Sequence, residues 1–201
     1  MVKALVGEVK TLSQSEINSI ITPLSAEALA RLEKKNEALR MQSLCAISLL
    51  NRLVGRSLLS RLKYEENGRP YLDGVDVDIS FSHTDSYVAC ATSDKRSSRV
   101  GIDIETKAIT DDEAKKIARR FFSVGEQDVL NKSENVKQAF LEIWTKKEAL
   151  KKHLDDGRPL LSLDTSEPES FGVEFLTRTL PNGALTVCTK KGEVCDIKFL
   201  F

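Results

Sequence analysis

The sequence has little of what marks several classes of protein. Its 30 Lys and Arg residues are matched by 30 Asp and Glu residues, so the formal net charge is zero. This balance argues against a strongly basic nucleic-acid coat and against an acidic solvating tail as descriptions of the whole chain. No apolar run approaches the roughly 20 residues that a membrane-spanning helix needs. The first eight residues lack a signal-peptide layout, and we expect a strand there and a cytoplasmic protein.

Cysteine and histidine are also scarce. The four cysteines form no C-x-x-C pair, and the two histidines are His83 and His153. A zinc site needs several such ligands close together. We therefore expect four buried thiols in a reducing compartment and no zinc centre.

What is present fits a globular protein, with 41% hydrophobic and 30% charged residues over 201 positions. Helical spacing predicts helices within 25–54, 110–122 and 136–153, and strands are predicted at 77–82, 87–92, 100–105, 172–178, 184–190 and 194–199. Both halves begin with a strand, continue through helices, contain Gly-Arg-Pro and end in strands. We expect an α+β pseudo-dimer of two similar α/β halves, each a small, mostly antiparallel sheet packed with helices. The halves would be residues 1–98 and 99–201, with an active site at the seam between them.

The run Val100-Gly101-Ile102-Asp103-Ile104-Glu105 is the strongest chemical signal. Alternation along a strand places Asp103 and Glu105 on one face, about 7 Å apart, while Gly101 leaves room for a ligand or a close backbone. Two carboxylates this close repel each other, and Mg²⁺ would relieve the conflict. An exposed strand face with two solvated acids is the alternative.

A second pattern lies in the predicted helix 136–153. Trp144, Glu148 and Lys152 form one i, i+4 row, whereas Lys147 falls in the middle of the apolar stripe. A lysine in that position must reach solvent or meet an anion. The row suits a phosphate site, and an ordinary charged helix with salt bridges is the alternative.

Further candidates are Ser82-His83, Arg69, Arg40 and Glu126. Neighbouring strand residues point in opposite directions, so Ser82 and His83 do not form a nucleophile–base pair. Pro70 is expected to aim Arg69 outward from its turn, where its guanidinium could hold a phosphate. Arg40 is a weaker cationic candidate, and Glu126 is equally well explained as a helix-capping residue.

Together, Gly-Arg-Pro-Tyr, Phe-Ser-His-Thr, Val-Gly-Ile-Asp-Ile-Glu and Trp-Thr-x-Lys-Glu-Ala-x-x-Lys, in this order, resemble a 4′-phosphopantetheinyl transferase. The two-halved length resembles the surfactin-synthetase-activating, monomeric type. The resemblance implies an enzyme that uses coenzyme A and Mg²⁺ and moves the 4′-phosphopantetheine arm to a serine of an acyl or peptidyl carrier protein. Adenosine 3′,5′-bisphosphate would leave. Such carrier proteins serve fatty-acid, polyketide or peptide biosynthesis.

The resemblance also implies roles for individual residues. Asp103, Glu105 and Glu148 would hold the metal, Glu148 would serve as metal ligand or general base, and Lys152 would steady a phosphate. Coenzyme A would be bound by a set of polar side chains: Arg40, Arg69, Ser82, His83, Lys147 and Lys152. Glu126 is a possible further metal ligand. A docking patch for the carrier protein is expected near Lys146, Lys151 and the Phe121-Phe122 segment.

Two other functions remain open. The chain could be a non-catalytic protein that binds coenzyme A or a nucleotide on the same fold. It could also be a metal-dependent phosphohydrolase that uses water in place of the serine.

Overall fold

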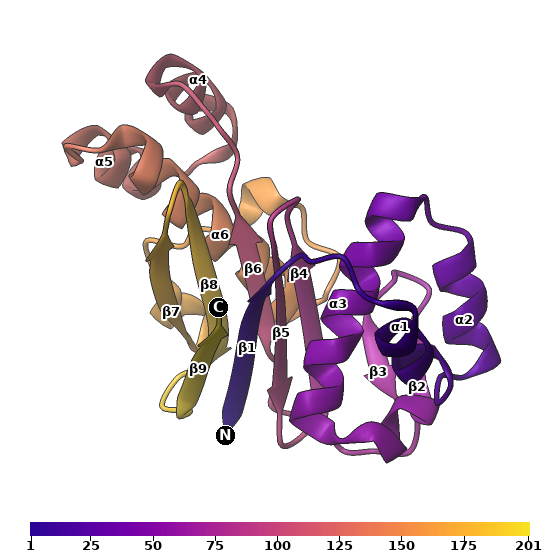
Figure 1. Ribbon diagram of the computed structural model, residues 1–201. Coiled ribbons are helices and arrows are strands. Elements are labelled where there is room, and N and C mark those ends of the chain that lie inside the picture. The colour runs from indigo at the N-terminus through magenta and orange to yellow at the C-terminus, as the bar shows by residue number, and fades with distance from the viewer. The chain divides into compact units, whose positions relative to one another are not determined.

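The computed structural model describes residues 1–201 and contains two compact units. The first comprises residues 1–100 and 194–201, and the second comprises residues 101–193. One sheet of six strands and one of three confirm the expected α+β class (Figure 1). The chain therefore returns to the first unit at its end, whereas sequence order alone had placed residues 99–201 in one half.

The first unit is built on the six-stranded sheet, in the order β2-β3-β4-β5-β1-β9. Its strands are β1 (Val2–Glu8), β2 (Leu62–Tyr64), β3 (Pro70–Leu72), β4 (Asp78–His83), β5 (Tyr87–Ser93) and β9 (Cys195–Leu200). Its helices are α1 (Gln14–Ile21), α2 (Ala26–Glu33), α3 (Glu37–Val54) and the 3-10 turn η1 (Arg56–Arg61). All neighbouring strands are antiparallel except β1 and β9, which are parallel.

Helix α3 packs against strands β5, β1 and β4, and α1 and α2 pack against α3 (Figure 1). Its buried side chains include Leu44, Ile47 and Leu50, which recur at helical spacing and join the core of this unit. Asn36 caps the helix by accepting a hydrogen bond from the Leu39 amide.

The second unit is built on the three-stranded antiparallel sheet, in the order β6-β8-β7. Its strands are β6 (Gly101–Glu105), β7 (Val173–Leu180) and β8 (Gly183–Lys190). Its helices are α4 (Asp111–Phe121), α5 (Val124–Lys132) and α6 (Val136–Leu154), with 3-10 turns η2 (Leu160–Ser162) and η3 (Pro168–Phe171). Helix α6 packs mainly on β8 and β6, and α4 and α5 contact α6.

Local sequence signals place several of these elements. Thr110 and Ser123 form capping boxes with Glu113 and Glu126, which start α4 and α5. Asn182, with φ of 57°, closes the tight turn between β7 and β8. None of the helices is both long and apolar enough to cross a membrane.

The repeated Gly-Arg-Pro does not mark equivalent structures in the two units. Pro70 begins strand β3, whereas Pro159 precedes the 3-10 turn η2. Only the glycines agree, because Gly68 and Gly157 both have positive φ angles, of 89° and 77°. The tripeptide reflects a shared turn conformation, for which glycine is suited.

Candidate active site

Strand β6 and helix α6 approach each other closely at Gly101. A Cβ atom at this position would lie 1.9 Å from the Ala149 carbonyl oxygen. Because glycine has no Cβ, the helix backbone can lie directly on this face of the strand. The prediction that Gly101 admits a close backbone is confirmed, and α6 thereby covers the face that carries Asp103.

Asp103 and Lys152 form a polar contact between β6 and α6. The Lys152 Nζ donates to Asp103 Oδ1 at 2.7 Å and to the Ile102 carbonyl oxygen at 3.0 Å. The Lys152 side chain is 30% exposed and that of Asp103 is 10% exposed. The two predicted site residues therefore meet at the surface of this unit.

Glu148 lies one helical turn before Lys152 and belongs to the same electrostatic group. Burial raises the pKa of its carboxyl above 4.5, and the neighbouring negative charges of Asp103 and Glu105 raise it further, while Lys152 and Lys151 lower it. The structure thus brings Asp103, Glu148 and Lys152 together, with Glu105 within electrostatic range.

The donor set can be tested for a magnesium ion. The carboxylate oxygens of Asp103, Glu105 and Glu148 are ligands that Mg²⁺ prefers. Burial is the main cause of the raised pKa of Glu148, and the charges of Asp103 and Glu105 add a repulsion that a cation would relieve. No three His, Cys, Asp or Glu side chains form a ready metal cluster, and Glu105 Oε1 accepts a hydrogen bond from the Thr106 amide. The chemistry of the residues therefore suits the ion, although their side chains are not arranged as a closed set of ligands.

Lys147 and Glu126 form a fully buried ion pair elsewhere on α6. The Lys147 Nζ donates to both Glu126 carboxylate oxygens, at 3.0 and 2.8 Å, and to the Leu163 carbonyl oxygen. These contacts use all three N–H groups of the ammonium. The expectation that Lys147 contacts coenzyme A is wrong for this structure, because the side chain is 0% exposed and meets a protein anion instead.

The Glu126 carboxylate also accepts hydrogen bonds from residues other than Lys147. Besides Lys147, its carboxylate accepts from the Thr165 amide and hydroxyl, both at 2.7 Å, and from the Ser123 amide at 2.8 Å. Glu126 therefore serves as a capping and ion-pair residue, and the structure does not support it as a metal ligand.

Arg69 lies in the first unit and does not point outward. Its side chain is 8% exposed, and its Nη2 atom donates to Asp78 Oδ2 at 2.5 Å and to the Val100 carbonyl oxygen at 3.1 Å. The expectation of an outward arginine is wrong, because a buried guanidinium needs an anion and Asp78 supplies it. Asp78 was not among the predicted site residues; it is the first residue of β4 and its side chain is 6% exposed.

Ser82 and His83 lie at the end of β4. Ser82 is buried and His83 is exposed, as expected for opposite faces of a strand. Gln42 of α3 donates to the Thr84 carbonyl oxygen at 3.2 Å. This contact brings the first turns of α3, which carry the exposed Arg40, next to the strand end that carries His83.

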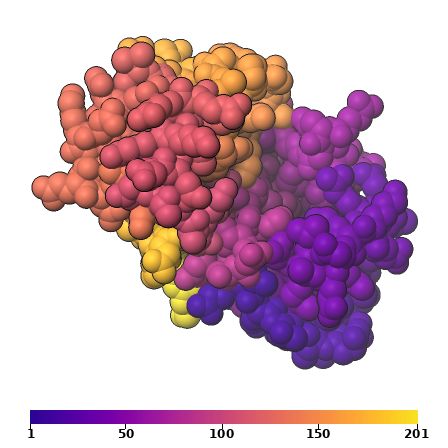
Figure 2. Space-filling view, turned by 90° about the horizontal axis from the view of Figure 1, so that it is seen from above, coloured from indigo at the N-terminus to yellow at the C-terminus, as the bar shows by residue number.

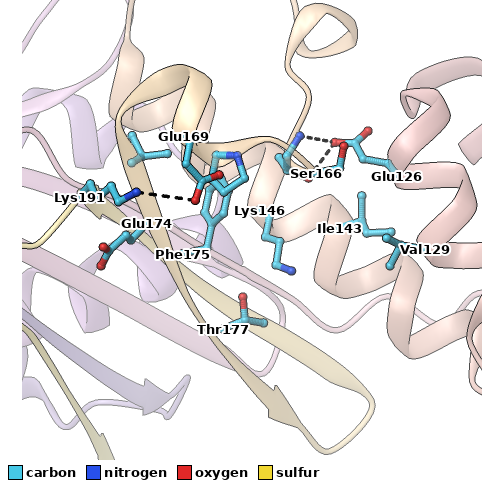
Figure 3. A pocket seen from close by; sticks show the side chains of 13 residues that line it. Glu126, Val129, Ile143, Lys146, Ser166, Glu169, Glu174, Phe175, Thr177 and Lys191 are labelled. Carbon is cyan, nitrogen blue, oxygen red and sulfur yellow. Dashed lines mark hydrogen bonds and ion pairs between the residues drawn. The ribbon is translucent and has the colours of Figure 1, made fainter.

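A separate pocket of about 640 Å³ lies between β7, α5, α6 and residues 165–169 (Figure 3). Lys146 extends into it from α6, and Lys191 forms an ion pair with Glu169 at 3.8 Å at its rim. Asp103, Glu148 and Lys152 do not line this pocket. Lys146 and Lys152 therefore face different surroundings, although both lie on α6.

A lysine beside carboxylates that suit a metal ion can neutralise charge near a reacting phosphate, which is the main requirement of phosphoryl transfer. Comparison with known proteins identifies the family of transferases to which the chain is similar. The family model described as the 4′-phosphopantetheinyl transferase superfamily matches residues 99–196.

Curated relatives extend the match. The 4′-phosphopantetheinyl transferase AcpT of Salmonella typhi is 32% identical over 148 residues, which cover 68% of this chain and 74% of the relative. AcpT of Salmonella typhimurium gives the same identity and coverage. The 4′-phosphopantetheinyl transferase gsp of Aneurinibacillus migulanus is 38% identical over 94 residues, which cover 46% of this chain and 37% of the relative. The chain belongs to the 4′-phosphopantetheinyl transferase superfamily, which confirms the resemblance noted from its motifs.

Proposed function

We propose that this chain transfers the 4′-phosphopantetheine arm of coenzyme A to a serine of an acyl or peptidyl carrier protein and releases adenosine 3′,5′-bisphosphate. The observation that carries the proposal is the meeting of Asp103, Glu148 and Lys152 where α6 packs on β6. Family membership supports the transferase class and coenzyme A as its substrate.

In this reaction, the serine oxygen attacks the β-phosphorus of coenzyme A. The bond from that phosphorus to the oxygen bridging the two phosphates breaks, and the bridging oxygen keeps the electron pair. Glu148 takes the serine proton, because its raised pKa brings the carboxylate closer to that of an effective base at neutral pH. Lys152 holds the phosphoryl oxygens and offsets their charge.

Magnesium is part of the proposal. Asp103, Glu105 and Glu148 would hold the ion, which would neutralise charge on the pyrophosphate and stabilise the leaving group. The residues of the chain would then have different roles. Asp103 would orient Lys152 through the 2.7 Å contact, and Glu148 would accept the proton of the serine.

The first unit would supply contacts to the nucleotide. His83 and Arg40 are exposed and lie on elements joined by Gln42, so they are suited to bind phosphates of coenzyme A, with Ser82 nearby. Arg69 would act by supporting this strand through Asp78. A monomeric enzyme and a cytoplasmic location complete the proposal.

The test is intact-mass analysis of a panel of apo carrier proteins incubated with coenzyme A, with and without Mg²⁺. Wild-type enzyme should add one phosphopantetheine group, and Glu148→Gln should lower the rate by about 10²–10⁴-fold. Glu134→Gln, which changes an exposed carboxylate just before α6, is the matched control. Full transfer in the presence of a chelator would refute the role of the metal.

The same assay separates the competing functions. Coenzyme A binding without transfer to any carrier would favour a non-catalytic binding protein. Free phosphopantetheine released without a carrier protein would favour a phosphohydrolase.

A further inference from the structure

Three threonine hydroxyls form a hydrogen-bonded chain between α6 and the sheet of the second unit. Thr186 Oγ1 on β8 lies 2.9 Å from Thr145 Oγ1 on α6 and 3.0 Å from Thr177 Oγ1 on β7. Thr145 Oγ1 also donates to the Glu142 carbonyl oxygen at 3.2 Å. Because a hydroxyl has one proton to donate, Thr186 donates to Thr145, and Thr177 in turn donates to Thr186.

The inner two hydroxyls are enclosed by protein. Thr145 and Thr186 are both 0% exposed, and α4 and α5, in rose and salmon on the face seen in Figure 2, also pack on α6. A buried hydroxyl needs a hydrogen-bond partner, and a displacement of about 1 Å would take these two oxygens beyond hydrogen-bond distance. The pair therefore favours one placement of α6 on β8, whereas apolar packing is non-directional.

The strand register places this pair beside the candidate active site. Thr186 lies directly opposite Asp103 in the pairing of β8 with β6. Opposite residues of an antiparallel pair share a face, with Cβ atoms about 4.5–5.5 Å apart. On α6, Glu148 follows Thr145 by three residues, which places both on neighbouring parts of one helix side. The hydroxyl pair therefore joins α6 to the sheet next to the residues of the candidate site.

The pair is also the middle one of a row of contacts between α6 and the sheet. The α6 residues of this row are spaced four, three, four and three positions apart, which places them on one face of the helix. Of the polar contacts in the row, the Thr145–Thr186 pair alone joins two side chains that are 0% exposed. The row consists of Gln138 with Gly183, Glu142 with Thr179, Thr145 with Thr186, Ala149 with Gly101, and Lys152 with Asp103.

We infer that Thr145 and Thr186 are positioning residues, which hold α6 at the rotation and register at which Glu148 and Lys152 meet Asp103. The inference rests on the proposed function and extends it to residues that cannot touch a substrate, because both are fully buried. They act through the backbones of α6 and β8. Misplacing a catalytic group by about 1 Å can lower a rate by about 10²-fold, so a small shift of α6 is enough to matter.

The test separates positioning from a contribution to stability alone. Thr145→Val/Thr186→Val removes both hydroxyls and keeps the side-chain shape, and removing both partners of a buried hydrogen bond can be nearly neutral for stability. Thr177 lines the pocket of Figure 3, where water can accept its proton. Thr145→Ser/Thr186→Ser keeps the hydroxyls and removes two buried methyl groups, which lowers stability. Thr189→Val is the matched control, because Thr189 is a buried threonine on the opposite face of β8.

The two double variants should rank in opposite order for stability and for activity. We expect the double valine variant to unfold near the denaturant midpoint of the wild type, with kcat lowered about 10-fold or more and KM for coenzyme A within about 3-fold. The double serine variant should unfold at a lower midpoint, with kcat within about 3-fold of the wild type. Thr189→Val should also keep kcat within about 3-fold.

A crystal structure of the double valine variant gives a readout that does not depend on activity. The distance from Lys152 Nζ to Asp103 Oδ1, 2.7 Å in the wild type, should exceed about 3.5 Å. If the wild-type chain transfers nothing to any carrier protein, the proposed function fails, and this distance still decides whether the hydroxyl pair places α6.

Three results would overturn the inference. The first is an unchanged kcat or an intact Lys152–Asp103 contact in the double valine variant. The second is a kcat lowered more than about 10-fold in a folded double serine variant, which tests the inference even if the valine variant does not fold. The third is an equal loss of kcat in Thr189→Val.

Discussion

Two lysines of helix α6, Lys147 and Lys152, have the same side chain in opposite environments. Lys147 is 0% exposed and is enclosed by Glu126 and the Leu163 carbonyl oxygen. Lys152, five positions later, is 30% exposed and contacts Asp103 at the surface of its unit. The first lysine is tied to its protein partners, and the second lies where a ligand can reach it.

The difference shows that one helix can carry a lysine that stabilises the fold and a second lysine that is available to a reaction site. A buried ammonium with three protein acceptors cannot exchange partners without leaving Glu126 uncompensated. A partly exposed ammonium can move from a carboxylate to a phosphate at little free-energy cost, because water screens both states. The Lys147–Glu126 pair therefore anchors α6, and the Lys152–Asp103 pair is suited to function.

The largest predicted effect concerns Lys147. Lys147→Ala should lower the free energy of unfolding by about 3–5 kcal/mol, because it leaves the Glu126 carboxylate buried and unpaired. Denaturant unfolding followed by circular dichroism measures the change. Glu126→Gln/Lys147→Met should recover part of the loss, since the buried charge is removed and the amide oxygen can still accept from the Thr165 amide and hydroxyl, which both donate to one oxygen of Glu126.

Lys146→Ala is the matched control, because its side chain lines an open pocket and forms no ion pair. It should change the unfolding free energy by less than about 1 kcal/mol. If Lys147→Ala also lowered the unfolding free energy by less than about 1 kcal/mol, the conclusion that the buried Lys147–Glu126 pair stabilises the fold would be wrong.

The second prediction concerns Lys152, for which we expect a large loss of activity and a small loss of stability. Lys152→Ala should lower the transfer rate by about 10²-fold through lost charge stabilisation at the phosphate, while the free energy of unfolding falls by at most about 1 kcal/mol. Lys151→Ala, an exposed neighbour, should leave both nearly unchanged. Initial rates of carrier modification with matched unfolding curves decide the outcome, and a large stability loss in Lys152→Ala would contradict it.

The third prediction concerns the close packing of α6 on β6 at Gly101. Gly101→Ala places a Cβ 1.9 Å from the Ala149 carbonyl oxygen, so the helix must shift away from β6. We expect a loss of about 1–3 kcal/mol in stability together with a lower transfer rate. Gly7→Ala is the control, because its added Cβ would meet a side-chain carbon at an ordinary 3.7 Å. Normal activity in Gly101→Ala would mean that the Asp103–Lys152 contact does not depend on this close packing.

The smallest prediction is a pH dependence at Glu148. Its pKa is raised in the folded state, so its ionisation destabilises the fold above about pH 4.5 and has no such effect in more acidic solution. Glu148→Gln should therefore be as stable as the wild type at neutral pH or more stable, by less than about 1 kcal/mol, and this advantage should disappear as the pH falls below 4.5. Melting temperatures across pH 3–8, with Glu134→Gln as control, measure it; a stability loss in the variant at neutral pH would contradict the direction of the shift.

Much of the local structure could be predicted. Helix α4 lies within the predicted helix 110–122 and starts after the capping residue Thr110, and β4 and β5 lie at the strands predicted for 77–82 and 87–92. The helix α1 was missed, although Ser13 and Glu16 form a capping box as well. Its apolar positions are few, so periodicity gave no signal there.

The candidate site was predicted in part. Asp103, Glu148 and Lys152 came from strand and helix periodicity together with a family resemblance, and they meet in the structure. Arg69 and Lys147 were assigned to the ligand, and the structure gives each a protein carboxylate as partner. Helical periodicity places Lys147 toward the interior, but it does not identify the anion that pairs with it, and for Arg69 the expected orientation itself was wrong.

The sequence by itself determined most of the helices and strands, the α+β class, the family and the face of β6 that carries the carboxylates, because these depend on local spacing and on short motifs. Only the tertiary structure decided which lysine of α6 is buried, that Asp78 neutralises Arg69, and that β9 joins the sheet of the first unit beside β1. Arg69 and Asp78 are 9 positions apart, Lys147 and Glu126 are 21 apart, and β1 and β9 lie near opposite ends of the sequence. Their energies come from burial and charge pairing in three dimensions, which no local pattern records.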